Sequence, residues 1–218
     1  KIEIDADEDT MRTFYSCMYR TFLYPHKAYE PDENGNPIHY SPAADKVLPG
    51  VRYTDNGFWD TYRTVYPLYT LIKPDMVTKT VNSFIARHKK TDYVRDTFVA
   101  GVDMNPQQGG DDVDNIICDA YVKGVPGIDW DKAYQVVKNH ADNYRIGWDS
   151  YAPPGADPGA PYYKLGYIPD DHAIPGTEYG QMACSYTLEQ SYNDHCAATM
   201  AKDLGTKEDY ESYTQRSR

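Results

Sequence analysis

Apolar residues recur at helical spacing along most of the chain, and alternating strand patterns are nearly absent. An apolar side chain at every third or fourth position creates one apolar face on an α-helix, which can pack against a core. Helices are therefore expected over residues 9–24, 57–72, 73–90, 111–124, 129–141 and 185–204, and from Thr206 onward. The pattern predicts an all-α fold built of antiparallel helix pairs.

The stripes also predict which side chains form the core. Segment 57–72 places Trp59, Tyr62 and Tyr66 together, before Pro67 ends or kinks the helix. The segment from Ser185 to Gly205 aligns Leu188, Tyr192, Cys196 and Met200. The helices between them contribute Val77, Val81, Phe84, Ile85, Val113, Ile116, Ile117, Ala120, Trp130, Ala133, Tyr134 and Val137.

Two long segments, roughly Pro25–Gly57 and Asn143–Met182, lack the helical pattern. Loops longer than about 15 residues are uncommon in compact domains and are usually functional or disordered. Both lead into helices, one carrying Trp59 and the other Glu189, so we expect them to meet at one rim. The final amphipathic pattern runs to the last residues, which predicts that the chain is one partial domain, 1–218, of a longer protein.

The formal net charge of −11 over 218 residues argues against nucleic acid and anionic membrane surfaces as partners. No apolar run reaches the roughly 20 residues of a membrane span, so no membrane partner is expected. The start of the chain lacks the apolar region of a signal peptide. The 22 Tyr, against 5 Phe, suit a polar cleft for sugars as well as an aromatic core with wet edges.

The stretch "SYTLEQSYNDH" places Glu189 near the start of a predicted helix. Thr187 and Gln190 have the spacing of a capping box, which would put Glu189 in the first helical turn. From the residues alone Glu189 is either a structural acid of that turn or a proton donor. Further along, Asp194 either faces solvent or makes a structural hydrogen bond, or it tunes such a site.

The pair Trp59–Asp60 has sugar-binding chemistry, since an aromatic face stacks on a pyranose while a carboxylate accepts hydroxyl hydrogen bonds. It also fits a core Trp beside a solvated Asp. Arg63 either pairs with Asp60 at i,i+3 or touches a ligand.

Metal-binding patterns are weak in this chain. "DMNPQQGGDDVD" lacks EF-hand spacing, so Asp111 and Asp112 fit helix caps better than calcium ligands. His195, next to Asp194, fits a surface or core position better than a metal site. The same holds for Asp170–His172.

Four motifs, "FWDTYRTVYPLYTLIKPDMV", "DNIICDAYVKGV", "YYKLGYIPDD" and "SYTLEQSYNDHCAATMAKDLGTKEDY", resemble glycoside hydrolase family 92 in order and spacing. The resemblance runs from about Phe14 to Ser217 and is nearer the fungal-type branch. The family comprises calcium-dependent exo-α-mannosidases. The resemblance therefore implies an (α/α)6 toroid and hydrolysis of terminal α-linked mannose with inversion.

By the same resemblance, Glu189 matches the general acid and Trp59–Asp60 the pair that holds the terminal mannose, with Arg63 one turn on. The family's calcium binds the mannose 2- and 3-hydroxyls. Its ligands and the general base belong to segments beyond residue 218, so chain 1–218 alone is expected to be inactive. The family also implies mannose-containing glycans as partners and secretion.

This chain departs from the family in two places. "GGDD", ending at Asp112, stands where many members have a Gly-Asp-His run, and Gln190 stands where an aromatic residue is common. The competing hypotheses are a non-catalytic helical glycan-binding or scaffold protein and a helical interaction module. Replacement of Glu189 by Gln separates them, because a binding module tolerates it and an enzyme does not.

Overall fold

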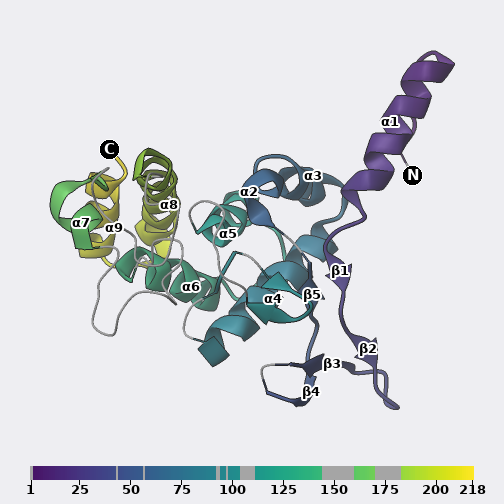
Figure 1. Ribbon diagram of the computed structural model, residues 1–218, viewed down its shortest axis with the longest axis horizontal. Helices are drawn as coiled ribbons and strands as arrows, with labels where there is room; N and C mark the ends of the chain where they lie inside the picture. Colours follow the sequence, from purple (N-terminus) through teal and green to yellow (C-terminus); the bar gives the residue numbers. More distant parts are fainter. Residues whose placement is uncertain are drawn as a thin grey trace.

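The computed structural model describes residues 2–42, 44–55, 57–91, 94–96, 98–103, 111–143, 160–169 and 183–218. Its helices are α1 Glu8–Thr21, α2 Phe58–Thr61, α3 Val65–Ile72, α4 Pro74–Thr91, α5 Asp112–Val122, α6 Trp130–Asp142, α7 Ala160–Leu165, α8 Ala183–Leu204 and α9 Lys207–Arg216. Figure 1 shows α3–α6 packed in the centre, α7–α9 at one end, and α1 projecting from the other. Helix dominates, as the periodicity predicts.

Short strands occupy the segment that lacks helical periodicity after Pro25. They are β1 His26–Lys27, β2 Glu30–Pro31, β3 Pro37–Ser41, β4 Lys46–Pro49 and β5 Tyr53–Thr54, followed later by β6 Phe98–Val99 and β7 Val102–Asp103. They pair antiparallel as β1–β5, β2–β3–β4 and β6–β7. The predicted all-α class is therefore correct for the helices but omits these sheets. Strands of two to five residues are too short to give an alternating pattern in the sequence.

The central core agrees with the predicted stripes of α4, α5 and α6. The predicted apolar residues of these helices are buried, apart from Trp130, which packs against the core while partly exposed. Pro74 opens α4, where its missing N–H costs no hydrogen bond. Gly124, with a φ of 65°, follows α5, a left-handed conformation that favours glycine.

The predicted helix over 57–72 is two helices. It breaks after Thr61, and Pro67 is the third residue of α3 instead of the end of a helix. The buried side chains are Phe58, Tyr62 and Tyr66, whereas Trp59 is 44% exposed. The predicted core position of Trp59 is therefore wrong, because the break between α2 and α3 changes the face that α2 buries.

Helix α8 differs most from its predicted form. It begins at Ala183, so Thr187 and Gln190 lie inside it and form no capping box. Leu188 is 72% exposed, and the buried face carries small and polar residues, with Gln190 and Asn193 among them. An apolar stripe is a poor guide to such a helix. By contrast, the last helix begins at Thr206 as predicted, and Thr206 caps α9 in a capping box with Asp209.

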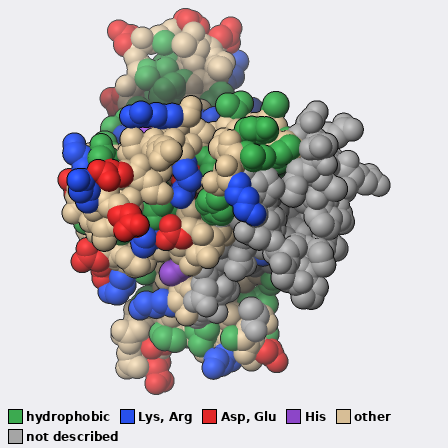
Figure 2. All heavy atoms as spheres, turned by 90° about the vertical axis from the view of Figure 1, so that its left-hand side faces the viewer, with side chains coloured by type: hydrophobic (Ala, Val, Ile, Leu, Met, Phe, Trp, Pro, Cys, Tyr) green, Lys and Arg blue, Asp and Glu red, His purple; other side chains and the backbone are tan. Residues whose placement is uncertain are grey.

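α8 lies at the junction of the structure, since it packs against α5, α6 and α9. The face formed by α7, α8 and α9 carries interspersed acidic and basic side chains (Figure 2). None of the helices in the described ranges combines the length and apolarity needed to cross a bilayer.

Candidate active site

Two of the predicted site residues, Arg63 and Glu189, meet between α2 and α8. Arg63 Nη2 donates to Glu189 Oε1 at 2.6 Å, and Tyr62 Oη donates to Glu189 Oε2 at 3.2 Å. The Glu189 side chain is 16% exposed, while that of Arg63 is 48% exposed. Glu189 is thus a mostly buried carboxyl group whose two oxygens are both held by donors from the end of α2.

Aromatic rings extend this contact along α8. The Arg63 guanidinium lies 4.4 Å from the Tyr62 ring centroid, and the Tyr62 ring stacks on Tyr192 at 6.1 Å. Tyr192 is 45% exposed, and its ring also stacks on His195. Burial, followed by the charge of Glu189, raises the pKa of Tyr62 above its ordinary range. Tyr62 therefore acts as a hydrogen-bond donor near neutral pH.

An open pocket of about 430 Å³ lies beside these residues. Its lining is Tyr62, Arg63, Pro67, Asn115, Asp119 and Tyr192. Aromatic faces with a few polar groups suit a sugar ring. A larger cavity, of about 710 Å³, is lined by the β3–β4 hairpin, α4 and the start of α6, without Glu189. Neither lining includes Glu189, and we assign the site to the smaller pocket because Tyr62 and Arg63, which bind Glu189, line it.

Asp112, which the sequence predicts to be a helix cap, is the first residue of α5. It is fully buried, and its electrostatic neighbours include Glu189 and Arg63. Burial, followed by the charges of Glu189 and Asp111, raises the pKa of Asp112 to about 8.

The remaining predicted site residues, Trp59 and Asp60, are exposed on α2. They precede the break after Thr61, whereas Arg63 follows it, outside α2. Arg63 makes its ion pair with Glu189, and no ion pair with Asp60 is found in the described part of the chain. The structure thus joins Arg63 to Glu189 and leaves Trp59 and Asp60 exposed on α2.

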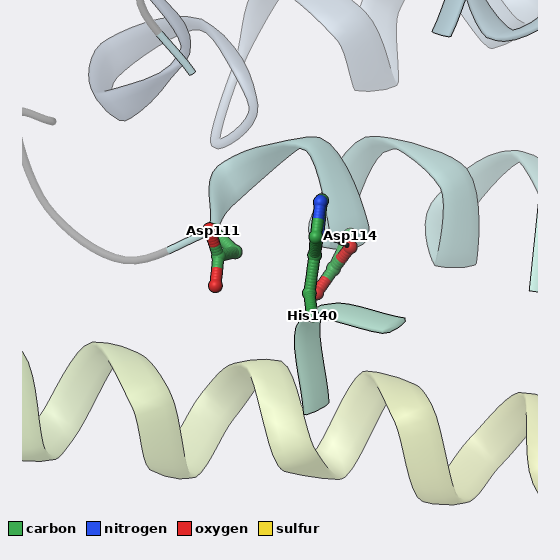
Figure 3. A group of neighbouring side chains, drawn as sticks. All are labelled: Asp111, Asp114 and His140. Carbon is green, nitrogen blue, oxygen red and sulfur yellow. Dashed lines mark hydrogen bonds and ion pairs between the residues drawn. The ribbon is translucent and has the colours of Figure 1, made fainter. Parts of the chain in front are cut away.

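Asp111, Asp114 and His140 form the group with metal-like spacing among the described residues, and Figure 3 shows Asp114 and His140 side by side. His140 Nδ1 lies 2.7 Å from Asp114 Oδ1, and His140 Nε2 accepts from the Val94 amide at 3.2 Å. The Val94 bond fixes the proton on Nδ1, so both ring nitrogens are engaged with protein.

Calcium takes six to eight oxygen ligands, and an imidazole with both nitrogens engaged does not fit. We therefore assign no metal ion to Asp111, Asp114 and His140. Asp194 and His195, the other pair considered as metal ligands, lie in different environments. Asp194 is buried, whereas His195 is exposed and stacks on Tyr192. Asp170–His172 lies outside the described residues.

Asp194 anchors the end of α9 to α8, so the structural hydrogen bond expected of it is present. Arg216 binds it through Nε–Oδ2 at 3.0 Å and Nη2–Oδ1 at 2.6 Å, and Tyr162 Oη donates to Oδ2 at 2.8 Å. Arg216 Nη2 also donates to the carbonyl of Ala141 at the end of α6. This network fixes α8, and with it Glu189, against α6 and α9.

The buried aspartates predict a pH dependence of stability. Burial holds the pKa values of Asp96 and Asp114 well above the ordinary value of 3.8, as it does that of Asp112. Between about pH 4 and 8 the native state therefore binds more protons than the unfolded state, so the free energy of unfolding falls as the pH rises. The pKa values of Asp55 and Asp209 are lowered, so these groups change the free energy of unfolding only below about pH 4.

Denaturant unfolding at pH 5 and pH 8 measures this effect. We expect a lower midpoint at pH 8, and a midpoint that rises with pH would contradict protonated aspartates in the native core.

Comparison with known proteins places this geometry in a family. The chain matches the glycosyl hydrolase family 92 catalytic domain over residues 1–218. It is similar to an uncharacterized secreted glycosidase of the fungus Arthroderma benhamiae, with 38% identity over 112 residues, covering 50% of this chain and 14% of that protein.

Solved structures from the same family are also similar to this chain. The fold is similar to that of a family GH92 inverting mannosidase of Bacteroides thetaiotaomicron, with a TM-score of 0.83, 34% identity, and coverage of 99% of this chain and 28% of that one. An α-mannosidase of the same family and organism, solved with mannoimidazole, gives a TM-score of 0.78, 26% identity, and coverage of 99% and 26%.

The chain spans 14–28% of the length of these relatives. A match over all of residues 1–218 and the likeness to two solved members lead to one conclusion. The chain belongs to glycosyl hydrolase family 92.

Proposed function

We propose that this chain is part of the catalytic domain of an exo-acting α-mannosidase, in which Glu189 donates the proton to the departing glycosidic oxygen. The observation that carries the proposal is the Glu189 carboxyl group, 16% exposed beside an aromatic-lined pocket and held through both oxygens by Tyr62 and Arg63. The mannosidase names of the solved relatives support mannose as the sugar.

We propose the following roles for the residues in and near the pocket. A mannose ring would stack its apolar face on Tyr192, while Asp60 accepts hydrogen bonds from its hydroxyls and Trp59 closes the rim. Arg63, half exposed, would move from Glu189 to a sugar oxygen when substrate binds. Glu189 would then be free to present a proton to the bond that breaks.

An inverting mechanism also needs a carboxylate that activates water, about 6.5–9.5 Å from the acid. We propose that this base, the calcium ligands and the rest of an (α/α)6 toroid are supplied by the remainder of the same polypeptide. The likeness to an inverting mannosidase supports inversion, and the name of the fungal relative supports secretion. When bound, the calcium would polarise sugar hydroxyls.

The test is an assay of the full-length protein that contains residues 1–218. α-1,2-, α-1,3-, α-1,4- and α-1,6-linked mannobioses are supplied in turn, with and without a calcium chelator. Proton NMR follows which anomer of mannose forms first. We expect β-mannose first from at least one linkage, with loss of release on chelation.

Failure to release mannose from every linkage, with mannobiose binding intact, would contradict the proposal. It would favour a glycan-binding protein. Residues 1–218 expressed alone serve as a control and are expected to release no mannose, because they lack the base.

A further inference from the structure

The Tyr62 hydroxyl reaches Glu189 from a fixed position. Tyr62 directly follows α2, where its amide donates to the carbonyl of Phe58 at 2.9 Å, and its side chain is buried in the central core. Its ring also stacks on Tyr192 of α8, with 6.1 Å between the ring centroids. Because the backbone and the ring are both packed, the hydroxyl group has little freedom to leave its 3.2 Å contact with Glu189 Oε2.

Arg63 holds the other oxygen of Glu189 in a different way. Its guanidinium lies 4.4 Å from the centroid of the Tyr62 ring and donates to Oε1 at 2.6 Å, from a side chain that is 48% exposed. Exposed side chains change rotamer within nanoseconds, whereas a packed ring lacks the space to do so. Of the two donors that bind Glu189, Arg63 is therefore the one that a substrate can displace.

The two donors also differ in the form of Glu189 that they suit. A guanidinium binds an ionised carboxylate best, because opposite charge strengthens the hydrogen bond. A neutral hydroxyl can also donate to the carbonyl oxygen of a protonated carboxyl group, which keeps acceptor capacity beside its own O–H. The Tyr62 bond can therefore persist while Glu189 carries a proton on the oxygen that Tyr62 does not contact.

We propose that Tyr62 is a positioning residue: its hydroxyl stays on Glu189 Oε2 through the reaction, so that Oε1, which Arg63 covers here, is the oxygen that delivers the proton. The inference rests on the proposed function and deepens it, since it assigns one atom of Glu189 to the acid step. In that step the O–H bond at Oε1 breaks and its proton goes to the glycosidic oxygen, while the C1–O bond breaks with its electrons on that oxygen. Water forms the new bond to C1 and gives a proton to the base. The Tyr62 O–H bond stays intact, and solvent returns a proton to Oε1.

Tyr62→Phe in the full-length protein tests this. Phe keeps the ring that stacks on Tyr192 and contacts Arg63, and the substitution removes only the hydroxyl group. We expect kcat on α-mannobiose to fall by about 10- to 100-fold, because the acid loses the bond that aims it, and KM to change less than about threefold. Hydrolysis of 2,4-dinitrophenyl α-mannoside, whose leaving group needs no proton, should change less than about twofold.

Tyr69→Phe is the matched control. Tyr69 is another buried tyrosine of the central core, on α3, and its hydroxyl donates to the Tyr24 carbonyl at 3.0 Å, so this change also removes a hydrogen bond from the core. It should leave the ratio of the two activities at the wild-type value. Equal losses by Tyr62→Phe on the two substrates would overturn the proposal and indicate that Tyr62 only supports the fold. A wild-type protein that releases no mannose would refute the proposed function, and this inference with it.

A second measurement does not require Tyr62→Phe to fold. A crystal structure of the wild-type full-length protein with a sulfur-linked mannobiose, which resists hydrolysis, would show which oxygen of Glu189 meets the bond between the sugars. We expect Tyr62 Oη at hydrogen-bond distance, about 3 Å, from one oxygen of Glu189 and the linking sulfur beside the other, with Arg63 moved away. A linking sulfur beside the oxygen that Tyr62 contacts, or Tyr62 separated from Glu189, would overturn the proposal.

Discussion

Glu189→Gln in the full-length protein is expected to lower kcat on α-mannobiose by about 10²–10⁴-fold, the contribution typical of a positioned acid. Gln retains an oxygen that accepts from Arg63 or Tyr62, so the site keeps its shape. It has no proton to give to the sugar oxygen. The loss should therefore fall on turnover, and mannose binding should persist.

Steady-state kinetics on the linkage that the wild-type protein cleaves gives this value. Glu211→Gln is the control, because Glu211 is exposed on α9 and its ion pair among the described residues is with the exposed Lys207. It should retain full turnover. A Glu189→Gln enzyme as fast as that control would show that Glu189 is a structural acid of α8.

Arg216→Met is expected to destabilise the protein by about 3–5 kcal/mol, the cost of leaving one member of a buried ion pair without its partner. The Asp194 side chain is fully buried and accepts from Arg216 through both oxygens. Burial already raises its pKa, and loss of the guanidinium would favour its protonated form further.

Denaturant unfolding of the full-length protein measures the loss. The control is Arg12→Met, which breaks an exposed pair with Glu8 on α1 and should cost less than about 1 kcal/mol. Asp194→Asn combined with Arg216→Met should recover part of the stability, since no uncompensated charge remains. Equal midpoints for Arg216→Met and Arg12→Met would contradict a structural role for the pair.

Helices α4, α5 and α6 could be predicted from sequence because their buried faces are apolar and their ends carry ordinary signals, such as Pro74 and Gly124. The same reasoning succeeded only in part for α8: Cys196 and Met200 are buried as predicted, whereas Leu188 and Tyr192 are exposed. Its inner face holds Asp194, Asn193 and Gln190, and periodicity of apolar residues does not register a face made of polar groups.

The site was predictable in part for a different reason. Glu189 and Arg63 were chosen by resemblance to a family, and their contact crosses 126 residues of sequence, which no local pattern reveals. Tyr62 was assigned to the core and is indeed buried, yet its hydroxyl reaches Glu189. The burial of Asp112 was not predicted, because local sequence does not reveal whether an acidic side chain is buried.

The most direct test of Glu189 as the proton donor compares two substrates in one pair of proteins. Wild type and Glu189→Gln are assayed on α-mannobiose and on 2,4-dinitrophenyl α-mannoside. The proposed role predicts a loss of about 10²–10⁴-fold on mannobiose and little loss on the activated mannoside, whose leaving group departs without a proton. Equal effects of the substitution on both substrates would contradict it.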